Sequence, residues 1–418
     1  MTEIMSKRLW LPGVGALILI AFLMACGSSY NSSSDGLVLV GSQGSAVIET
    51  FSFNLNSGHI SPVANSPNDT GNSTCLLNGI PTSIVLDPAG SYAYAIVTEN
   101  SSCSGSKNVI AAFKVLSDGN ITAVGSPVSD PHPVAMSMDA AGKFLFVSEG
   151  SGVNVYSIGT GAKLTLAKNA YTAPATALAP NFVALAATPT VFPAIGISGQ
   201  QNAVCSVPGN NPPSTQFLYA VDSVNYVLWE FQVNTSTGAL GNPTGTSVVP
   251  LFATDPVPAG IAVDPCDRFV YVTGSQNNRI NVYTICSAVS LPTCQKADGS
   301  LLAVEGSPFS MTGSANGPGP LVADPFGNYI YVLGTLSNTV SPFKVSPVTG
   351  KLTGGNPAVL ATGLQPKQLA IRGDDTWLFV TNNGAASMSQ FSITPATGVL
   401  TAQPVVQTDN QPWGVAVK

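Results

Sequence analysis

The chain has 418 residues, only 9% of them charged, and its formal net charge is −6. A chain so poor in Lys and Arg cannot form the basic surface that neutralises phosphates, so we exclude nucleic acid as a partner. Its 41 Gly and 32 Pro residues instead favour a fold of short strands joined by many tight turns.

Residues 1–25 are predicted to be a lipoprotein signal peptide. Lys7 and Arg8 precede an apolar stretch, Leu9–Ala25, that is short for a spanning helix and fits the hydrophobic part of a signal. The stretch leads into Leu-Met-Ala-Cys, ending at Cys26, which resembles the bacterial lipobox, where the cysteine is lipidated and becomes the first mature residue. An ordinary cleaved signal followed by a chance cysteine is the alternative.

Residues 26–35 are rich in Gly and Ser and are predicted to be a flexible tether. A lipid on Cys26 would bind the protein to a membrane of the cell envelope, outside the cytoplasm. Ser28, two residues after the cysteine, resembles the pattern for sorting to the outer membrane of a Gram-negative cell. The expected location is therefore extracytoplasmic and lipid-anchored.

Glycine turns followed by Leu or Ile recur along the rest of the chain. They lie at Gly58, Gly119, Gly161, Gly238, Gly299, Gly350 and Gly398. Hairpin turns at intervals of roughly 40 to 80 residues are typical of a radial repeat fold. We therefore predict an all-β fold for residues 36–418, a seven-bladed β-propeller with four strands in each blade.

A second pattern opens most blades. A short apolar strand ends in a turn such as Asp-Pro-x-Gly, and a strand with aromatic residues two positions apart follows. These segments begin at Ile80, His132, Pro258, Gly319 and Gln365. In blade 4 we expect the first strand at 181–187 and the second at 217–221, with an insertion at 188–216 between them.

The two ends of the propeller each supply part of one blade. Residues 36–41 read as a second strand with no first strand before it, and residues 411–418 read as a first strand with nothing after it. Pairing them would close the ring and remove its free sheet edges.

Six cysteines remain after Cys26, and an even number in an exported chain indicates disulfides. Each cysteine is expected on one of the two faces of the propeller, and these positions predict the pairs Cys75–Cys103, Cys205–Cys266 and Cys286–Cys294. The last four lie on one face, however, where three pairings are possible.

Two strand ends, Tyr-Val-Thr-Gly at 271–274 and Phe-Val-Thr-Asn at 379–382, resemble the YVTN-type repeat. Residues 36–418 thus resemble the bacterial lactonase-like seven-bladed propellers, a family with 6-phosphogluconolactonase-type and carboxymuconate-cyclase-type members. The resemblance implies the fold and makes lactone hydrolysis a candidate activity. It carries over no catalytic residue, because the sequence offers no catalytic motif beyond the repeat itself.

Aligning the repeats predicts which residues face the mouth of the central channel, where loops from all blades meet. The candidate catalytic residues are His132, Glu149, Asp222 and Glu99. The candidate ligand-binding residues are Arg279, Asn382, Gln365, Gln411 and Trp413. Carboxylates with one His could serve general base catalysis. The alternative is that each carboxylate caps its own loop and that His132 is an ordinary rim residue.

Two functions follow. The first is a lipid-anchored binding or scaffold module for a protein or glycan. A structural component of the cell envelope would show the same sequence features. The second is a lactone hydrolase, although the Arg residues are too dispersed for a phosphate site. We expect a monomer without a cofactor or a dedicated metal site, although the acidic mouth could hold a divalent cation.

Overall fold

A computed structural model of the chain describes residues 35–67, 79–99, 107–167, 171–172, 179–188, 216–242, 251–286, 294 and 298–418. The predicted signal peptide, the lipidated Cys26 and nearly all of the tether lie outside these residues, as do Cys75, Cys103 and Cys205. Within the described part of the chain, no helix has the length and apolar character needed to cross a membrane.

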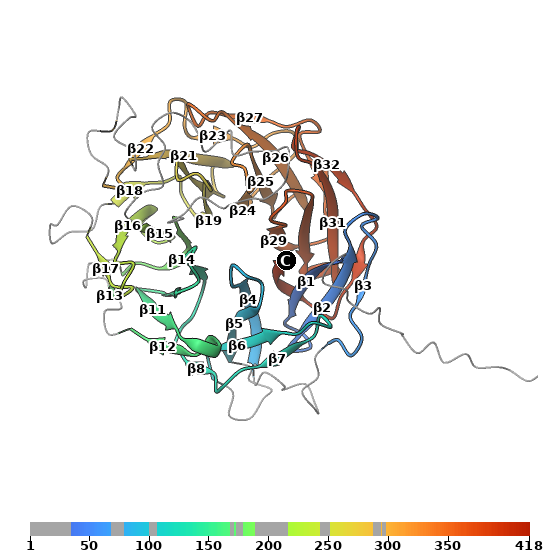
Figure 1. Cartoon of the computed structure of the whole chain (residues 1–418). Coiled ribbons are helices and arrows are strands. Elements are labelled where there is room, and N and C mark those ends of the chain that lie inside the picture. Colours follow the sequence, from blue (N-terminus) through green and yellow to red (C-terminus); the bar gives the residue numbers. More distant parts are fainter. Residues whose placement is uncertain are drawn as a thin grey trace, which may run out of the picture.

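Seven sheets surround a central axis, which confirms the predicted propeller (Figure 1). Blades 2 and 3 contain β4 (Gly79–Leu86), β5 (Tyr92–Glu99), β6 (Val109–Val115), β7 (Ile121–Ala123), β9 (Met136–Met138), β10 (Phe144–Glu149), β11 (Gly152–Ile158) and β12 (Leu164–Leu166). Blades 4 and 5 contain β14 (Phe182–Ala187), β15 (Gln216–Asp222), β16 (Val227–Val233), β17 (Leu240–Gly241), β19 (Pro258–Val263), β20 (Phe269–Gly274), β21 (Arg279–Ile285) and β22 (Leu301–Ala303). Blades 6 and 7 contain β24 (Pro318–Ala323), β25 (Tyr329–Gly334), β26 (Thr339–Val345), β27 (Leu352–Gly354), β29 (Pro366–Ile371), β30 (Trp377–Asn382), β31 (Ser387–Thr394) and β32 (Val399–Ala402).

Blade 1 closes the ring as predicted. Its strands are β34 (Pro412–Val417), β1 (Asp35–Ser42), β2 (Val47–Asn54) and β3 (Ile60–Pro62), in that order from the channel outward. The antiparallel pairing of β1 with β34 places Leu39 opposite Ala416 and so joins the two ends of the chain.

Each of blades 2 to 7 has one more short strand than the sequence predicted. This strand follows the fourth and also pairs with the third strand of its blade. These extra strands are β8 (Val128–Ser129), β13 (Tyr171–Thr172), β18 (Leu251–Ala253), β23 (Phe309–Ser310), β28 (Leu360–Ala361) and β33 (Val406–Gln407). Two short 3₁₀ helices, η1 (Thr160–Ala162) and η2 (Asn383–Ala385), complete the described elements.

The turn between the first and second strands of blade 3 shows why the Asp and Gly positions recur. The Asp139 carboxylate accepts hydrogen bonds from the backbone N–H groups of Lys143 and Phe144, each at 2.6 Å. Gly142 adopts a φ of 65°, a conformation that side chains disfavour. The turn therefore directs the chain from the channel strand back into the blade.

Hydrophobic packing between neighbouring blades forms the core. Phe146 of β10 belongs to the same buried cluster as Leu218 of β15 and Phe231 of β16, so blades 3 and 4 share one hydrophobic layer. Trp229 and Trp377 are also buried between blades. The alternating aromatic residues thus hold blade to blade rather than facing the channel.

A buried ion pair lies in the turn between the first and second strands of blade 5, and its arginine also binds the corresponding turn of blade 6. Arg268 donates to the two carboxylate oxygens of Asp264, at 2.9 and 2.6 Å, and to the carbonyl of Gly327 at 2.7 Å. Both charged side chains are buried. In blade 7, Arg372 pairs with Asp374. Both arginines therefore have structural partners.

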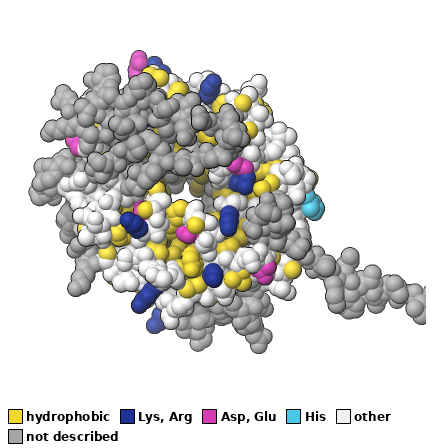
Figure 2. All heavy atoms as spheres, viewed as in Figure 1, with side chains coloured by type: hydrophobic (Ala, Val, Ile, Leu, Met, Phe, Trp, Pro, Cys, Tyr) yellow, Lys and Arg dark blue, Asp and Glu magenta, His cyan; other side chains and the backbone are white. Residues whose placement is uncertain are grey.

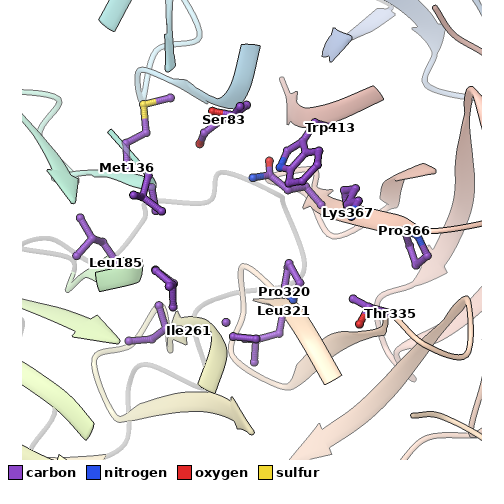
Figure 3. Close-up of a pocket in the computed structure, with 18 of the residues that line it drawn as sticks. Ser83, Met136, Leu185, Ile261, Pro320, Leu321, Thr335, Pro366, Lys367 and Trp413 are labelled. Atoms are coloured by element: carbon purple, nitrogen blue, oxygen red, sulfur yellow. The ribbon is translucent and has the colours of Figure 1, made fainter. Parts of the chain in front are cut away.

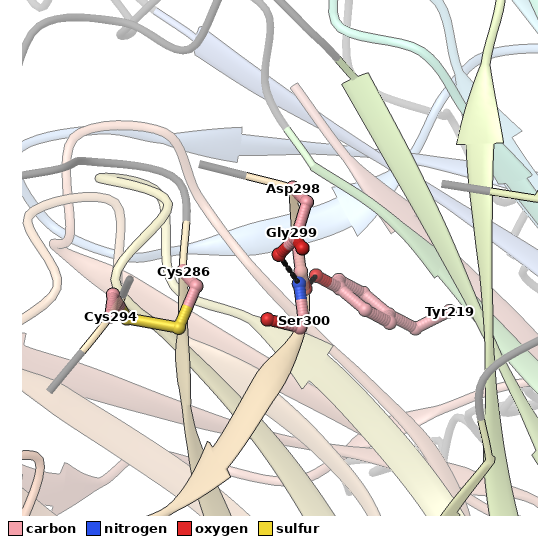
Figure 4. Close-up of a disulfide and its surroundings, with 6 residues drawn as sticks. All are labelled: Tyr219, Cys286, Cys294, Asp298, Gly299 and Ser300. Atoms are coloured by element: carbon pink, nitrogen blue, oxygen red, sulfur yellow. Dashed lines mark hydrogen bonds between the residues drawn. A yellow bond between two sulfur atoms is a disulfide. The ribbon is translucent and has the colours of Figure 1, made fainter. Parts of the chain in front are cut away.

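The predicted disulfide between Cys286 and Cys294 is present. Figure 4 shows it next to the turn that contains Asp298, Gly299 and Ser300. In the same view the hydroxyl of Tyr219, from blade 4, donates to the carbonyl of Gly299 at 2.8 Å. Cys266 is also disulfide-bonded, and its predicted partner Cys205 lies outside the described residues.

Candidate functional site

A pocket of about 630 Å³ lies in the central channel, and the first strands of all seven blades contribute to its wall. Figure 3 shows residues from several of these strands around one opening, among them Ser83, Met136, Leu185, Ile261 and Trp413. In the part of the chain that the structure describes, a ligand in this pocket would therefore lie between the first strands of all seven blades.

Apolar residues outnumber polar ones among the described residues of the channel wall. Its polar side chains, other than one lysine, are neutral: Thr82, Ser83, Thr335, Gln365 and Gln368. On the face shown in Figure 2, hydrophobic side chains lie below the central opening, and single basic and acidic side chains are scattered among them. Such a wall favours an apolar ligand over a highly charged one.

Small residues let the channel strands approach one another. A Cβ atom at Gly260 of β19 would lie only 2.6 Å from the carbonyl oxygen of Gly319 in β24. The neighbouring first strands are therefore in near backbone contact at this point, and a larger residue at position 260 would push blades 5 and 6 apart.

Among the described residues that line the pocket, Lys367 is the only ionisable one. Its Nζ atom lies 4.5 Å from the centre of the Trp413 ring, so that a cation on β29 rests against an aromatic face on β34. Figure 3 shows the two side chains next to each other on the channel wall. A cation–π contact of this kind contributes about 0.5–2 kcal/mol and holds the ammonium group in place.

Of the residues predicted at the mouth, Gln365 and Trp413 line this pocket. The sequence did not single out Lys367, although it follows Gln365 by only two positions. The repeated motifs point to strand ends and loops, whereas the pocket is formed largely by residues within the first strands.

Asp222, at the end of β15, is fully buried and does not line the pocket. Its carboxylate accepts hydrogen bonds from the backbone N–H groups of Asn181, Val224 and Asn225, at 3.2, 3.0 and 3.1 Å. It also accepts from the Asn225 side chain at 2.7 Å and from the Trp229 indole at 3.2 Å. This arrangement matches the alternative in which the carboxylate caps its own loop.

Glu149, at the end of β10, is half-buried next to a second carboxyl group, Asp130. Burial and then the adjacent Asp130 raise the pKa of Glu149 to about 8. Asp130 accepts hydrogen bonds from the Tyr156 hydroxyl at 2.6 Å and from the Asn154 amide at 3.2 Å. The negative charge of Asp130 adds to burial in disfavouring the ionised form of Glu149.

Glu99 and His132 are exposed, and one asparagine connects their loops. The Asn108 side chain accepts from the backbone N–H of Glu99 and donates to the carbonyl of Pro131, each at 2.7 Å. The structure thus places the loops of these two candidates next to each other in blades 2 and 3. Neither residue lines the channel pocket, and their catalytic role stays a prediction.

The other ligand-binding candidates lie around the pocket rather than in its wall. Arg279 and Gln411 are exposed. Asn382 is buried, and its side chain accepts from the backbone N–H of Gly363 at 3.0 Å. Within the described ranges, no three His, Cys, Asp or Glu side chains are placed to hold a metal ion. A cation at the mouth also stays a prediction.

The sequence matches the profile of a family described as "Lactonase, 7-bladed beta-propeller" over residues 38–181, 210–353 and 295–417. No curated protein sequence matches the chain. A Bacteroides fragilis protein provisionally named a 6-phosphogluconolactonase is similar in structure, with 17% identity, a TM-score of 0.67, and coverage of 94% of this chain and 100% of that one.

Two further structures are similar. The periplasmic gluconolactonase of Pseudomonas aeruginosa shares 15% identity at a TM-score of 0.67, covering 92% of this chain and 99% of its own. A functionally unknown protein from Desulfotomaculum acetoxidans shares 15% identity at a TM-score of 0.60, covering 92% of this chain and 98% of its own. At such low identity these likenesses show a common fold and leave the activity open.

Proposed function

This chain belongs to the lactonase family of seven-bladed β-propellers, and we propose that within this family it is a ligand-binding module whose site is the central channel. We also propose that the protein is anchored by a lipid at Cys26, that it lies outside the cytoplasm, and that it has a ligand-binding or scaffold role in the cell envelope.

The composition of the channel wall carries the proposal. A lactone hydrolase needs a general base within hydrogen-bond reach of the attacking water. No carboxylate, imidazole or thiol is among the described residues that line the pocket. The wall instead offers one cation, one aromatic ring and many small apolar groups, which are features of a site that holds a molecule without transforming it.

The predicted acidic groups support the same interpretation. Five hydrogen bonds already occupy the Asp222 carboxylate, and Glu149 is paired with Asp130. The many apolar side chains of the wall also suit a small ligand with an apolar body better than the protein or glycan ligand expected from the sequence.

Lactone hydrolysis is the second candidate, favoured by the names of two structural neighbours. In that case Glu149 would be the best acid or base, because its raised pKa lies near neutrality. The substrate would then have to bind outside the channel pocket, over the loops of blades 2 and 3.

The test compares binding and turnover in the full-length chain. Ala259 lines the channel, so Ala259→Phe should fill part of the pocket, and Ala402→Phe on the exposed outer strand β32 is the matched control. We expect small-molecule probes to raise the melting temperature of the wild type and of Ala402→Phe but not of Ala259→Phe. Steady acid release from gluconolactone or 6-phosphogluconolactone that Glu149→Gln abolishes would favour the hydrolase.

A further inference from the structure

We propose that the channel ligand is a carboxylate with an apolar body, whose charged group binds Lys367 while its body contacts the opposite wall. This inference rests on the proposed binding function and names the class of molecule that the site takes. It follows from how charge, aromatic surface and apolar surface are distributed around the pocket.

Lys367 forms no ion pair with the described residues, and the contact given for its ammonium group is with the Trp413 ring. An ammonium group carries three N–H donors, and the Trp413 ring face at 4.5 Å accepts no conventional hydrogen bond. No carboxylate is among the described residues that line the pocket. Removing water from an ammonium group costs free energy unless a hydrogen-bond acceptor replaces that water. The carboxylate of a ligand would supply such an acceptor and the opposite charge.

The wall across the pocket is apolar. Figure 3 shows Met136, Leu185 and Ile261 on the side of the opening away from Lys367 and Trp413. These three side chains come from blades 3, 4 and 5, and all are largely buried in the wall. The pocket therefore has two unlike sides, which suits a molecule with one charged end and one apolar end.

Some of the polar wall groups are already engaged within the protein. The Thr335 hydroxyl donates to the carbonyl of Gly317 at 2.7 Å, and the Gln368 side-chain oxygen accepts from the backbone N–H of Val415 at 3.4 Å. These side chains therefore have fewer free donors and acceptors for a ligand with many hydroxyl groups. A sugar acid would leave several of its hydroxyls without partners against the apolar side, and unmet polar groups weaken binding.

The size of the pocket agrees with a small molecule. Its volume of about 630 Å³ lies within the range of roughly 300–1,000 Å³ that is usual for small-molecule sites. Octanoate and 3-phenylpropanoate are suitable probes, because each carries a single carboxylate on an apolar body. Their primary amides have nearly the same shape without the charge.

The experiment titrates the full-length chain with these probes by calorimetry. We expect both carboxylates to bind, and each amide to bind about 10- to 100-fold more weakly, the usual effect of one charge-assisted hydrogen bond. Lys367→Gln should weaken carboxylate binding by a similar factor and leave amide binding unchanged. Lys367→Arg should keep the preference, and Lys344→Gln, on an exposed face of β26, is the control.

Several results would overturn the ligand class. These are equal binding of carboxylate and amide, tighter binding of gluconate than of 3-phenylpropanoate, or carboxylate binding that Ala259→Phe leaves unchanged. Absence of binding by any apolar carboxylate would overturn it as well. Turnover of a lactone would instead contradict the proposed binding function, so the two failures can be told apart. Melting curves of each Lys367 variant show whether a loss of binding reflects misfolding.

Discussion

The Asp222 carboxylate accepts a hydrogen bond of 3.2 Å from the indole N–H of Trp229, seven residues further along the chain. The indole belongs to the buried layer between blades 3 and 4. One carboxylate therefore connects the loop between β15 and β16 to the hydrophobic core, and this connection accounts for its burial without a catalytic role.

Asp222→Asn should destabilise the propeller by about 1–3 kcal/mol, because it weakens charge-assisted hydrogen bonds to a buried group. Urea unfolding at pH 7 measures the change, and ligand binding in the channel should persist. A variant that keeps its stability and loses ligand binding would instead place Asp222 in the functional site.

Glu149→Gln should change how stability depends on pH. In the folded protein the pKa of Glu149 is raised to about 8 from an ordinary value of 4.5. The folded state thus holds a proton that the unfolded state has lost, so wild-type stability falls as the pH rises from about 4.5 through 8. Gln at this position cannot ionise, and the variant should gain stability relative to the wild type across this window.

Urea unfolding of both proteins at pH 5, 7 and 9 measures this difference. It should grow with pH up to about 8 and then level off at about 1 kcal/mol or more, because one pKa unit corresponds to 1.36 kcal/mol and the partial exposure of Glu149 reduces the effect. Parallel pH profiles for the two proteins would show that folding does not raise the pKa of Glu149.

Much of the fold could be predicted from the sequence because its signals are local. The turn at Asp139 needs only neighbouring residues, and the first strand expected at 181–187 is found at Phe182–Ala187. The closing pair of β1 and β34 was also predictable, because each end of the chain lacks the strand that the other supplies.

The site was harder to predict because its contacts are not local. Lys367 and Trp413 come from different blades and meet only because the ring closes. Asp130 follows the extra strand β8 of blade 2, which the sequence did not reveal, so the partner of Glu149 could not be identified. The repeats show which positions are equivalent from blade to blade, but they do not show which side chains of other blades lie next to those positions.

Arg268→Ala should be among the most destabilising single changes in the described part of the chain. It would leave the buried Asp264 carboxylate unpaired and remove a bond to Gly327 in the next blade. Breaking a buried ion pair in this way costs about 3–5 kcal/mol. Chemical unfolding tests this, with Lys351→Ala, which breaks the exposed pair with Glu305, as a control that should change stability little.

Cys26→Ser should prevent lipid attachment, because the proposed anchor forms on the thiol of this residue. Cells labelled with radioactive palmitate should show a labelled wild-type band and an unlabelled variant that keeps its signal peptide. Equal labelling of the two proteins would contradict the proposed anchor while leaving the channel site unaffected.

The most direct test of the central claim is the intrinsic fluorescence of Trp413 during titration with 3-phenylpropanoate. Trp229 and Trp377 are buried between blades, so a ligand in the channel should perturb mainly Trp413. We predict a saturable change in the wild type that is absent in both Trp413→Phe and Ala259→Phe. A saturable change of the same size in Ala259→Phe would contradict a binding site in the central channel.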